Sequence, residues 1–578
     1  MKYSKKIPIL FLLTCFILAC NPPTAVQDDT DDTDINGYAD ETFYKVESKE
    51  ILNRQGIPVV IKGLGLGGWF MPEGYMFRMP GGYGPTAIRQ KIAELLGASL
   101  ADQWFELFRD NYVREDDIIA MKEWGVDHIR IPFHYDIFYD KNSETFIEKG
   151  FERIDQVLIW CKRHRMDVIL DMHAAPGAQS AGPIADSDGV ARFWTEKETY
   201  WPMTILIWEE LARRYKDETI IIGYDILNEP VTPTGYGASD LRNFYDQIVP
   251  AIRTIDTNHI LFIEGDYWAT TFDELYPPFD DNMVYAFHKY WNETDQGTIQ
   301  YLLNMRNDHN TPLWLGETGE NSNPWYYETR QLAEQHEIGW NWWTHKKLET
   351  TRAPLSSPSN ENYEKVVNYW KGNGPQPTTE EARQGLFQMA EDLAIEKTTL
   401  RPDLIASLFS DQFGTTNQPY TNIEIPGQIF AVDYDIGNQG VSYSDTEYKE
   451  VSSDENQNTG NNGWSYRNDG VDIESCSDPT IDYNIGWIET GEWLEYTVNI
   501  TKSGSYTTKA IIASTGAGKM RIKVNGKQIG SDMDIPDTGG NQDWGQINFG
   551  QQSFTAGEAL VRVEILEGGF SFAMISVN

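Results

Sequence analysis

Apolar runs alternate with amphipathic stretches between residues 59 and 346. Eight runs are rich in β-branched and aromatic residues, and the segments between them repeat apolar residues at helical spacing, as Ile154, Val157, Leu158 and Cys161 do. Eight alternations of strand and helix predict a (β/α)8 barrel. The expected strands lie in 59–70, 128–135, 167–177, 221–230, 260–268, 283–291, 313–320 and 338–345.

The pattern changes to strict alternation in the last 150 or so residues. Leu494, Tyr496 and Val498 alternate with polar neighbours, and Asn525 with Gly526 marks a tight turn between two such runs. Short alternating strands with this punctuation predict an all-β, jelly-roll-like sandwich. Between the two domains, 347–409 is polar and helix-prone, which predicts a loop over the barrel mouth and a closing helix, and 410–424 has the Thr, Asn, Gln and Pro content of a linker.

The N-terminal segment has the order of charge and hydrophobicity of a secretory signal. Lys2, Lys5 and Lys6 precede an apolar run that ends in Leu-Ala-Cys, which resembles a bacterial lipobox with Cys20 as the lipidated first residue of the mature chain. Plain secretion is the alternative. We expect a cell-envelope lipoprotein, located at the outer membrane and held there through its lipid anchor only.

The acidic segment after Cys20 predicts a disordered tether. It also resembles surface-export signals of Bacteroidota lipoproteins, and a simple solvated spacer fits equally well. The expected organisation is a signal peptide at 1–19, the tether at 20–41, the barrel domain at 42–409, the linker at 410–424 and the sandwich at 425–578.

Length and charge narrow the class of function. A chain of 578 residues is long enough for two or more cores. Its formal net charge is −40, and −43 once the signal is removed, which argues against a nucleic-acid partner because phosphates are bound mainly by cations. Neutral sugars face no such repulsion, and 13% of the residues are aromatic. Cys161 and Cys476 fall in different predicted domains, so we expect no disulfide.

Two glutamates stand at the ends of predicted barrel strands. Glu229 is followed at once by Pro230, and Glu317 closes another apolar run, so both should project from carboxyl ends of strands, where barrel enzymes keep their chemistry. A pair of carboxyl groups can protonate a glycosidic oxygen and attack or stabilise the anomeric carbon. Glu264 and Glu320 are rival carboxylates, which we interpret as supporting residues. The chain lacks a Cys cluster or His-Glu-x-x-His spacing, so we expect no catalytic metal and no cofactor.

Six motifs in order resemble glycoside hydrolase family 5, a cellulase-like family of retaining barrel enzymes. They are Ile-Arg-Ile-Pro at 129–132, Asp-Met-His at 171–173, Leu-Asn-Glu-Pro at 227–230, His-Lys-Tyr at 288–290, Gly-Glu at 316–317 and Trp-Asn-Trp-Trp at 340–343. The resemblance implies that Glu229 is the general acid/base, that Glu317 is the nucleophile and that Arg130 holds Glu317 ionised. It further implies that the sugar is bound by Asn228, His173, His288, Tyr290 and Trp343.

Within that family the closest branch is that of the exo-β-1,3-glucanases. The segments that resemble it are 65–69, Pro72 with Glu73, and 173–179. The chain departs from this branch at Met172, at Ala174 and in the insert 180–200. A β-glucan is therefore the expected substrate, with β-1,3, β-1,4 and β-1,6 linkages and exo or endo action all open.

The C-terminal segment resembles a carbohydrate-binding module of family 6. The motifs lie at 440–445, 470–474, 486–496 and 538–544. The resemblance implies that Trp487 and Trp544 sandwich a sugar ring, with Ser571 standing where the family has a sugar-binding asparagine. Phe430 and Val432 replace acidic residues of the first strand, so the family's structural calcium is doubtful. Burial of both Trp side chains in the core is the alternative.

The combined hypothesis is a retaining β-glucan hydrolase with an appended sugar-binding domain. A glycan-binding lipoprotein with an inactive barrel and a transglycosylase that shares the covalent intermediate are the alternatives. Retention predicts that the carboxyl groups of Glu229 and Glu317 lie about 5 to 5.5 Å apart, whereas inversion needs about 6.5 to 9.5 Å.

Overall fold

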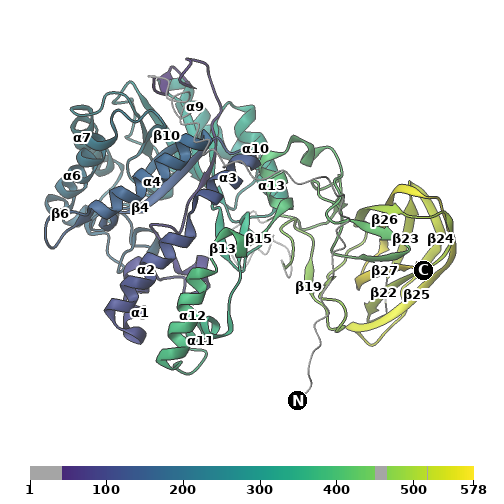
Figure 1. Cartoon of the computed structure of the whole chain (residues 1–578). Helices are drawn as coiled ribbons and strands as arrows, with labels where there is room; N and C mark the ends of the chain where they lie inside the picture. The colour runs from purple at the N-terminus through teal and green to yellow at the C-terminus, as the bar shows by residue number, and fades with distance from the viewer. Residues whose placement is uncertain (1–41, 450–464, 517) are drawn as a thin grey trace, which may run out of the picture.

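The computed structural model describes residues 42–449, 465–516 and 518–578, and its larger domain is a closed barrel of eight parallel strands. Each strand lies inside one of the eight predicted runs, so the barrel is confirmed, with strands shorter than the runs (Figure 1). In cyclic order the strands are β3 (Lys62–Gly65), β4 (His128–His134), β7 (Asp167–Ala174), β8 (Ile221–Asp225), β9 (Ile260–Glu264), β10 (Met283–Lys289), β11 (Leu313–Gly319) and β12 (Gly339–Trp343).

Helices follow the strands and cover the outside of the barrel, as right-handed β-α-β connections require. In α4 (Glu148–His164) the face predicted from Ile154, Val157, Leu158 and Cys161 is buried against the sheet. The other helices of the ring and its connections are α3 (Glu115–Trp124), α5 (Arg192–Thr195), α6 (Lys197–Tyr215), α7 (Ala238–Arg253), α8 (Asp266–Ala269), α9 (Gln300–His309), α10 (Asn323–Gln335) and α13 (Pro402–Phe409).

A hairpin seals the amino-terminal end of the barrel. Strands β1 (Lys45–Glu47) and β2 (Glu50–Leu52) pair with each other, and Tyr44 and Ile51 join a cluster with Ile222, Phe262 and Trp314 from the barrel strands. The hydroxyl of Tyr44 donates a hydrogen bond to Asp167 at the start of β7 (2.8 Å). Since this end is closed and buried, the open end is the carboxyl end of the strands.

Residues 346–409 are more regular than the expected loop and closing helix. They form a small sheet of β13 (Lys346–Leu348), β14 (Leu355–Ser357) and β15 (Thr399–Leu400), together with the helix pair α11 (Glu361–Trp370) and α12 (Thr379–Glu391). The pair packs on α1 (Pro85–Leu96) and α2 (Ala98–Tyr112), which precede α3 and extend to one side of the barrel (Figure 1). The prediction of a loop followed by a closing helix missed this sheet and helix pair, because their packing partners in α1 and α2 are far away in the sequence.

The C-terminal domain is built from two β-sheets around one apolar core, as predicted. One sheet contains β16 (Ile423–Ile425), β18 (Tyr443–Ser444), β21 (Trp493–Ile500), β23 (Lys519–Val524), β24 (Lys527–Asp534) and β26 (Gly557–Glu567). The other contains β17 (Gly427–Phe430), β19 (Ile473–Ser475), β20 (Tyr483–Ile485), β22 (Gly504–Ser514), β25 (Gly540–Phe554) and β27 (Phe570–Val577). Asn525 and Gly526 both have positive φ, as the predicted tight turn requires.

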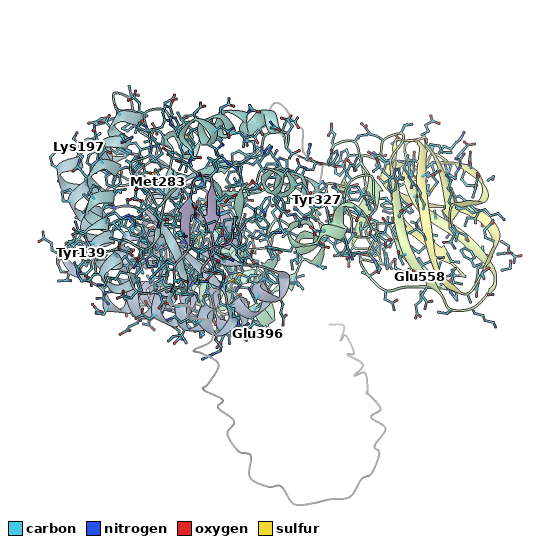
Figure 2. All side chains as sticks on the ribbon, turned by 90° about the horizontal axis from the view of Figure 1, so that it is seen from above. Tyr139, Lys197, Met283, Tyr327, Glu396 and Glu558 are labelled. Atoms are coloured by element: carbon cyan, nitrogen blue, oxygen red, sulfur yellow. The ribbon has the colours of Figure 1, made fainter. Side chains whose placement is uncertain are left out.

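The connection between the domains is packed rather than loose. A short helix, η7 (Asp411–Gly414), places Phe413 in a fully buried position 5.5 Å from the ring of Tyr327 on α10. Figure 2 shows Tyr327 on the side of the barrel that faces the sandwich, and Glu558 on the sandwich itself. The sandwich therefore docks beside α10 and α13.

The predicted signal peptide, Cys20 and the acidic tether lie outside the described residues. Within the residues that are described, no helix combines the length and hydrophobicity that a membrane span needs.

Candidate active site

Glu229 lies four residues beyond the end of β8, at the open end of the barrel. Its φ of 41° puts it in the left-handed region, which non-glycine residues adopt only when their surroundings hold them there. The backbone N–H of Glu229 donates to the carboxylate of Glu264 at the end of β9 (2.6 Å). Glu264 thus fixes the backbone that carries Glu229, which fits its interpretation as a supporting residue.

Glu317 projects from β11 and is held through both of its oxygens. The guanidinium of Arg130 on β4 donates to Oε2 (2.9 Å), and the hydroxyl of Tyr290 donates to Oε1 (2.8 Å). Arg130 is fully buried and also donates to Asp225 on β8 and to the side-chain oxygen of Asn228 (both 2.8 Å). One guanidinium therefore fixes the ends of three strands around Glu317.

His288 on β10 lies between the two halves of the site. Its Nδ1 is 2.7 Å from Glu229 Oε1, and its Nε2 is 3.2 Å from Glu264. Burial opposes a charge on this imidazole, but the carboxylates of Glu264 and Glu317 and the hydrogen bond to Glu229 outweigh it and hold the pKa of His288 well above its ordinary value. The side chain therefore brings a proton next to Glu229.

The site holds more carboxyl groups than cations, and their pKa values respond to that excess. Burial raises the pKa of Asp171, behind Arg130, to about 8, although Arg130 pulls it down. Burial also raises the pKa of Glu317; His288 and Arg130 oppose the rise and the carboxylate of Glu229 adds to it. The proton affinity of Glu317 therefore depends on the charge of Glu229.

Trp343, His173 and Tyr75 form one wall of the site. The rings of Trp343 and His173 are stacked, with centroids 5.2 Å apart and an interplanar angle of 7°, and Trp343 Nε1 donates to the hydroxyl of Tyr75 (2.8 Å). A Cβ at Gly67 would lie 2.4 Å from the Trp343 ring, so this position excludes larger side chains. Trp342 points instead into an aromatic cluster with Trp340, which supports the choice of Trp343 over its neighbour.

Glu73 lies in one of the segments that resemble the exo-β-1,3-glucanases, but it is not among the predicted site residues. It is almost fully buried in the loop after β3, where burial and then the carboxylates of Glu317 and Glu229 raise its pKa to about 8. Lys347 lies near it and forms an ion pair with Glu320, and burial lowers the pKa of Lys347 to about 7. Glu73 follows the first predicted strand by three residues, so its position at the open end of the barrel could be predicted, but its place beside Glu229 and Glu317 could not.

Glu229, His288 and Glu317 are the one group of His, Cys, Asp and Glu side chains in the described residues whose atoms could hold a metal ion, all within 4.8 Å of one another. The donors do not suit a cation. Both oxygens of Glu317 already accept hydrogen bonds, one of them from the positively charged Arg130, and Glu229 is bonded to His288. The same spacing brings an oxygen of Glu229 within 4.8 Å of an oxygen of Glu317.

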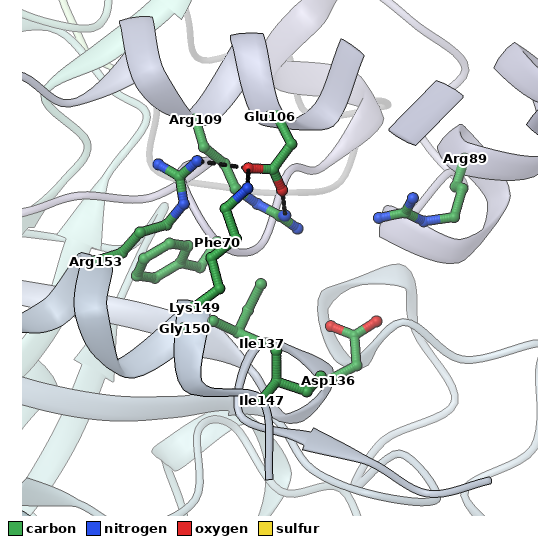
Figure 3. Close-up of a pocket in the computed structure, with 10 residues that line it drawn as sticks. All are labelled: Phe70, Arg89, Glu106, Arg109, Asp136, Ile137, Ile147, Lys149, Gly150 and Arg153. Atoms are coloured by element: carbon green, nitrogen blue, oxygen red, sulfur yellow. Dashed lines mark hydrogen bonds and ion pairs between the residues drawn. The ribbon is translucent and has the colours of Figure 1, made fainter. Parts of the chain in front are cut away.

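A second hollow on the outside of the barrel has a different character. It lies between α2 and α4 and is lined by Arg89, Arg109, Lys149 and Arg153 (Figure 3). Glu106 lies among three of these cations, and Arg89 and Arg153 have further partners in Asp102 and Asp110. Because its charges are matched within the protein, this hollow is a network of ion pairs.

The residues expected to bind sugar in the sandwich differ in exposure. Trp487 is 50% exposed, in the turn between β20 and β21, while Trp544 on β25 is partly buried and donates from Nε1 to Ser477 (3.0 Å). Ser571 shares a row of paired residues with Trp544 but is only 2% exposed. Gln542, two positions from Trp544, donates to Glu474 (2.7 Å) and is more exposed than Ser571.

Comparison with known proteins finds a family match in each domain. Residues 89–348 match the cellulase family (glycosyl hydrolase family 5), and residues 467–577 match a carbohydrate-binding module of family 35. The expected class of the C-terminal module is thus supported, but family 35 takes the place of the family 6 that its motifs resemble.

Three curated relatives each match less than half of this chain. A beta-xylosidase of Phanerodontia chrysosporium is 33% identical over 252 residues, 43% of this chain and 52% of that protein. Cellodextrinase A of Ruminococcus flavefaciens is 30% identical over 40% of this chain and 58% of its own length, and a probable glucan 1,3-beta-glucosidase A of Aspergillus clavatus is 25% identical over 43% and 59%. The chain spans little more than half the length of these relatives.

Among solved structures, endoglucanase Cel5A of Thermotoga maritima matches with a TM-score of 0.34 and 18% identity, over 40% of this chain and 82% of that one. The cellulase Cel5C_n matches with a TM-score of 0.39 and 18% identity, over 60% and 92%. The barrel region of the chain thus matches the cellulase family (glycosyl hydrolase family 5), and the C-terminal region matches a carbohydrate-binding module of family 35.

Proposed function

We propose that this protein is a retaining β-glycoside hydrolase that acts on a β-glucan. The observation that carries the proposal is the pair of buried carboxyl groups, Glu229 and Glu317, at the carboxyl ends of β8 and β11 with oxygens within 4.8 Å of each other. A direct attack on the anomeric carbon needs this short spacing, whereas inversion leaves room for a water molecule between the two groups.

In the proposed mechanism Glu317 attacks the anomeric carbon and Glu229 gives its proton to the leaving oxygen. Arg130 and Tyr290 donate to the two oxygens of Glu317 and so aim the carboxylate. In the second half, Glu229 removes a proton from water as the water cleaves the glycosyl–Glu317 bond, which restores both carboxyl groups. His288 supports both halves, since it shares a hydrogen bond with the carboxyl group that alternately gives and takes the proton.

We infer a sugar position between this pair and the wall of His173 and Trp343. The amide nitrogen of Asn228 is 3.5 Å from His173, and its oxygen is already used by Arg130, so the amide N–H groups are oriented toward the sugar side. Trp343 offers a flat apolar surface for a sugar face. Glu73 and Tyr75 stand at the same end and would contact the sugar hydroxyl groups farthest from the bond that is cleaved.

The linkage is the finer part of the proposal. The three relatives above are named for xylosidase, cellodextrinase and glucan 1,3-beta-glucosidase activities, and the motifs at 65–69 and 173–179 favour a β-1,3-glucan among these. The sandwich is proposed to bind the same class of glycan through the exposed face of Trp487 and through Trp544 with Gln542.

The N-terminal segment supports a location at the cell envelope, with the chain anchored through Cys20. Fractionation of cells that express the chain with Cys20→Ala tests this: the anchored protein should move from the membrane to the soluble fraction. An unchanged distribution would contradict lipidation at this residue.

A panel of linkage-defined oligosaccharides tests the activity, with products followed by NMR from the first minutes. The expected result is release of reducing sugar whose first anomer is β, from at least one β-glucan, and no release by Glu317→Gln. An α-anomer formed first would overturn retention. No release from any β-glucan, with unchanged glycan affinity in Glu317→Gln, would favour an inactive glycan-binding barrel. Products longer than the substrate at high acceptor concentration would favour a transglycosylase.

A further inference from the structure

The segment that follows the strand of Glu317 is held by the sandwich. Asn321 and Asn323, in the segment from the end of β11 to the first turn of α10, are hydrogen-bonded to Asn468 and Asp469 of the C-terminal domain. Asn323 donates its backbone N–H to the carbonyl of Asn468 (2.7 Å), so a carbonyl of the sandwich satisfies an N–H in the first turn of α10. The Asn468 side chain donates to the carbonyl of Asn321 (2.8 Å) and to Asn323 Oδ1 (2.9 Å).

This junction is a buried polar network and not a surface contact. Asn321, Ser322, Asn323, Asn468 and Asp469 are each at most 1% exposed. The amide of Asn323 donates to Asp469 of the sandwich (2.7 Å) and to Asp403 of α13 (2.8 Å). Loss of one partner in such a network leaves buried polar groups unsatisfied, at a cost of about 1 to 3 kcal/mol each.

The sandwich side of the junction is itself rigid. Arg467 is fully buried, forms an ion pair with Asp469 (2.5 Å), and lies over the rings of Tyr420 (4.2 Å) and Tyr434 (3.8 Å). Arg401 of the barrel domain donates to the carbonyl of Tyr466 (2.9 Å). The backbone at 466–469 is thus fixed from both domains.

The held segment also reaches the wall of the active site. Glu320, three residues after Glu317, accepts a hydrogen bond from the hydroxyl of Tyr75 (3.3 Å) and pairs with Lys347. Tyr75 in turn accepts from Trp343. A continuous set of contacts therefore runs from Asn468, through residues 321–323 and Glu320, to Tyr75 and Trp343.

We propose that Asn468 and Asn323 are positioning residues for catalysis, so that the sandwich is a structural part of the catalytic unit as well as a glycan-binding module. The inference rests on the proposed function only where it concerns the rate of catalysis. The sandwich fixes the segment after Glu317 and, through Glu320, the wall of the sugar site. Displacement of a reacting group by about 1 Å can lower a rate by up to about 100-fold, so loss of this support should appear in turnover.

The test uses the full chain and a soluble substrate too small to reach the sandwich: the aryl glycoside or short oligosaccharide that the wild-type protein cleaves fastest. Asn468→Ala removes both side-chain donors, Asn323→Ala removes the bridge to Asp403 and Asp469, and Asn499→Ala changes the same residue type at an exposed position on β21. Assays run well below the unfolding temperature, so that the folded fraction is the same in every chain.

The expected result for either interface variant is a kcat about tenfold below that of Asn499→Ala, with KM within about twofold, and a shift in the acidic limb of kcat/KM. The double variant should be no worse than the poorer single variant, because both remove one network. A residue with a merely structural role would leave the kcat and pH profile of the folded protein unchanged. If Asn468→Ala does not fold, Ser322→Ala, which removes only the hydroxyl bond to the carbonyl of Tyr448, replaces it.

Calorimetry gives a second readout that needs no activity. The wild-type chain should unfold in one cooperative transition, and the interface variants should separate it into two or lower its midpoint by several degrees relative to Asn499→Ala. Interface variants that match Asn499→Ala in kcat, in pH profile and in unfolding would overturn the proposal. A wild-type chain that cleaves no substrate would instead remove the proposed function, and the calorimetric comparison would still decide whether the two domains are coupled.

Discussion

The barrel mouth and the outer face of the sandwich present their chemistry in opposite ways. At the mouth, Arg130, Glu229 and Glu317 are buried; Arg130 donates to Glu317, and Glu229 is held by Glu264 and His288, so each position is fixed by its neighbours. On the sandwich, Trp487 is half exposed and Ser571 is covered. The contrast shows that a motif predicts a site well when neighbouring side chains fix its residues by hydrogen bonds. It predicts a site less well when the exposure of each residue is set by its own local turn.

The largest expected effect distinguishes the catalytic roles of the two carboxyl groups, Glu229 and Glu317. Glu317→Gln should lower kcat by more than about 10⁴-fold on every substrate, because no other group can form the covalent bond. Glu229→Gln should cost about 10² to 10⁴-fold with poor leaving groups. A dinitrophenyl glycoside has a leaving group that needs no proton. With this substrate, the rate at which Glu229→Gln forms the glycosyl-enzyme should return toward the wild-type rate. Equal losses for both variants on both substrates would contradict the assigned roles.

The next effect concerns the buried guanidinium. Arg130→Lys keeps the charge but loses the planar fork that bonds Asp225, Asn228 and Glu317 together. Breaking such a buried arrangement should reduce the free energy of unfolding by about 3 to 5 kcal/mol, measured by urea denaturation. Arg213→Lys on the exposed side of α6 is the matched control, with a change below about 0.5 kcal/mol. Equal stability of the two variants would mean that the fork is not needed.

A pH-dependent effect follows from Glu73. Its pKa is about 8 when folded, and an unfolded glutamate titrates near 4.3, so between these values the folded chain keeps a proton that the unfolded chain has lost. Stability should therefore fall as the pH rises from about 4.3 to about 8 and be unaffected by this group above that. Glu73→Gln removes the fall. Its stability advantage over the wild-type chain should grow from near zero at pH 4 to a plateau near pH 8; Lys347 is present in both chains. A constant difference in urea midpoints across this range would disprove the raised pKa.

The smallest effect tests the sandwich face. In a Glu317→Gln background, which prevents cleavage, Trp487→Ala should weaken affinity for insoluble β-glucan about tenfold, because an exposed indole ring is the main stacking surface available to a sugar there. Tyr506→Ala, near the start of β22, should not change this affinity. An equal loss of affinity in both variants would show that Trp487 is not a specific sugar-binding residue, and would contradict the inferred contrast between the barrel mouth and the sandwich face.

These differences also explain how much the sequence could predict. The eight barrel strands were found because buried parallel strands are continuous apolar runs, and Glu229 and Glu317 because a polar residue at the end of such a run has few structural reasons to be there. Glu73 was missed as a site residue because its significance depends on two carboxylates more than 150 positions away. The role of Asn468 could not be predicted, since nothing local to 466–469 reveals that the segment packs against the turn after β11.

The most direct test of the central claim is to trap the intermediate. A 2-fluoro-β-glycoside of the sugar preferred in the linkage panel, with a dinitrophenyl leaving group, should inactivate the protein and add the mass of one fluorosugar to a single peptide. The account predicts that this peptide carries the sugar on Glu317. A sugar attached to Glu229 or to any other residue, or slow turnover with no covalent adduct, would contradict it.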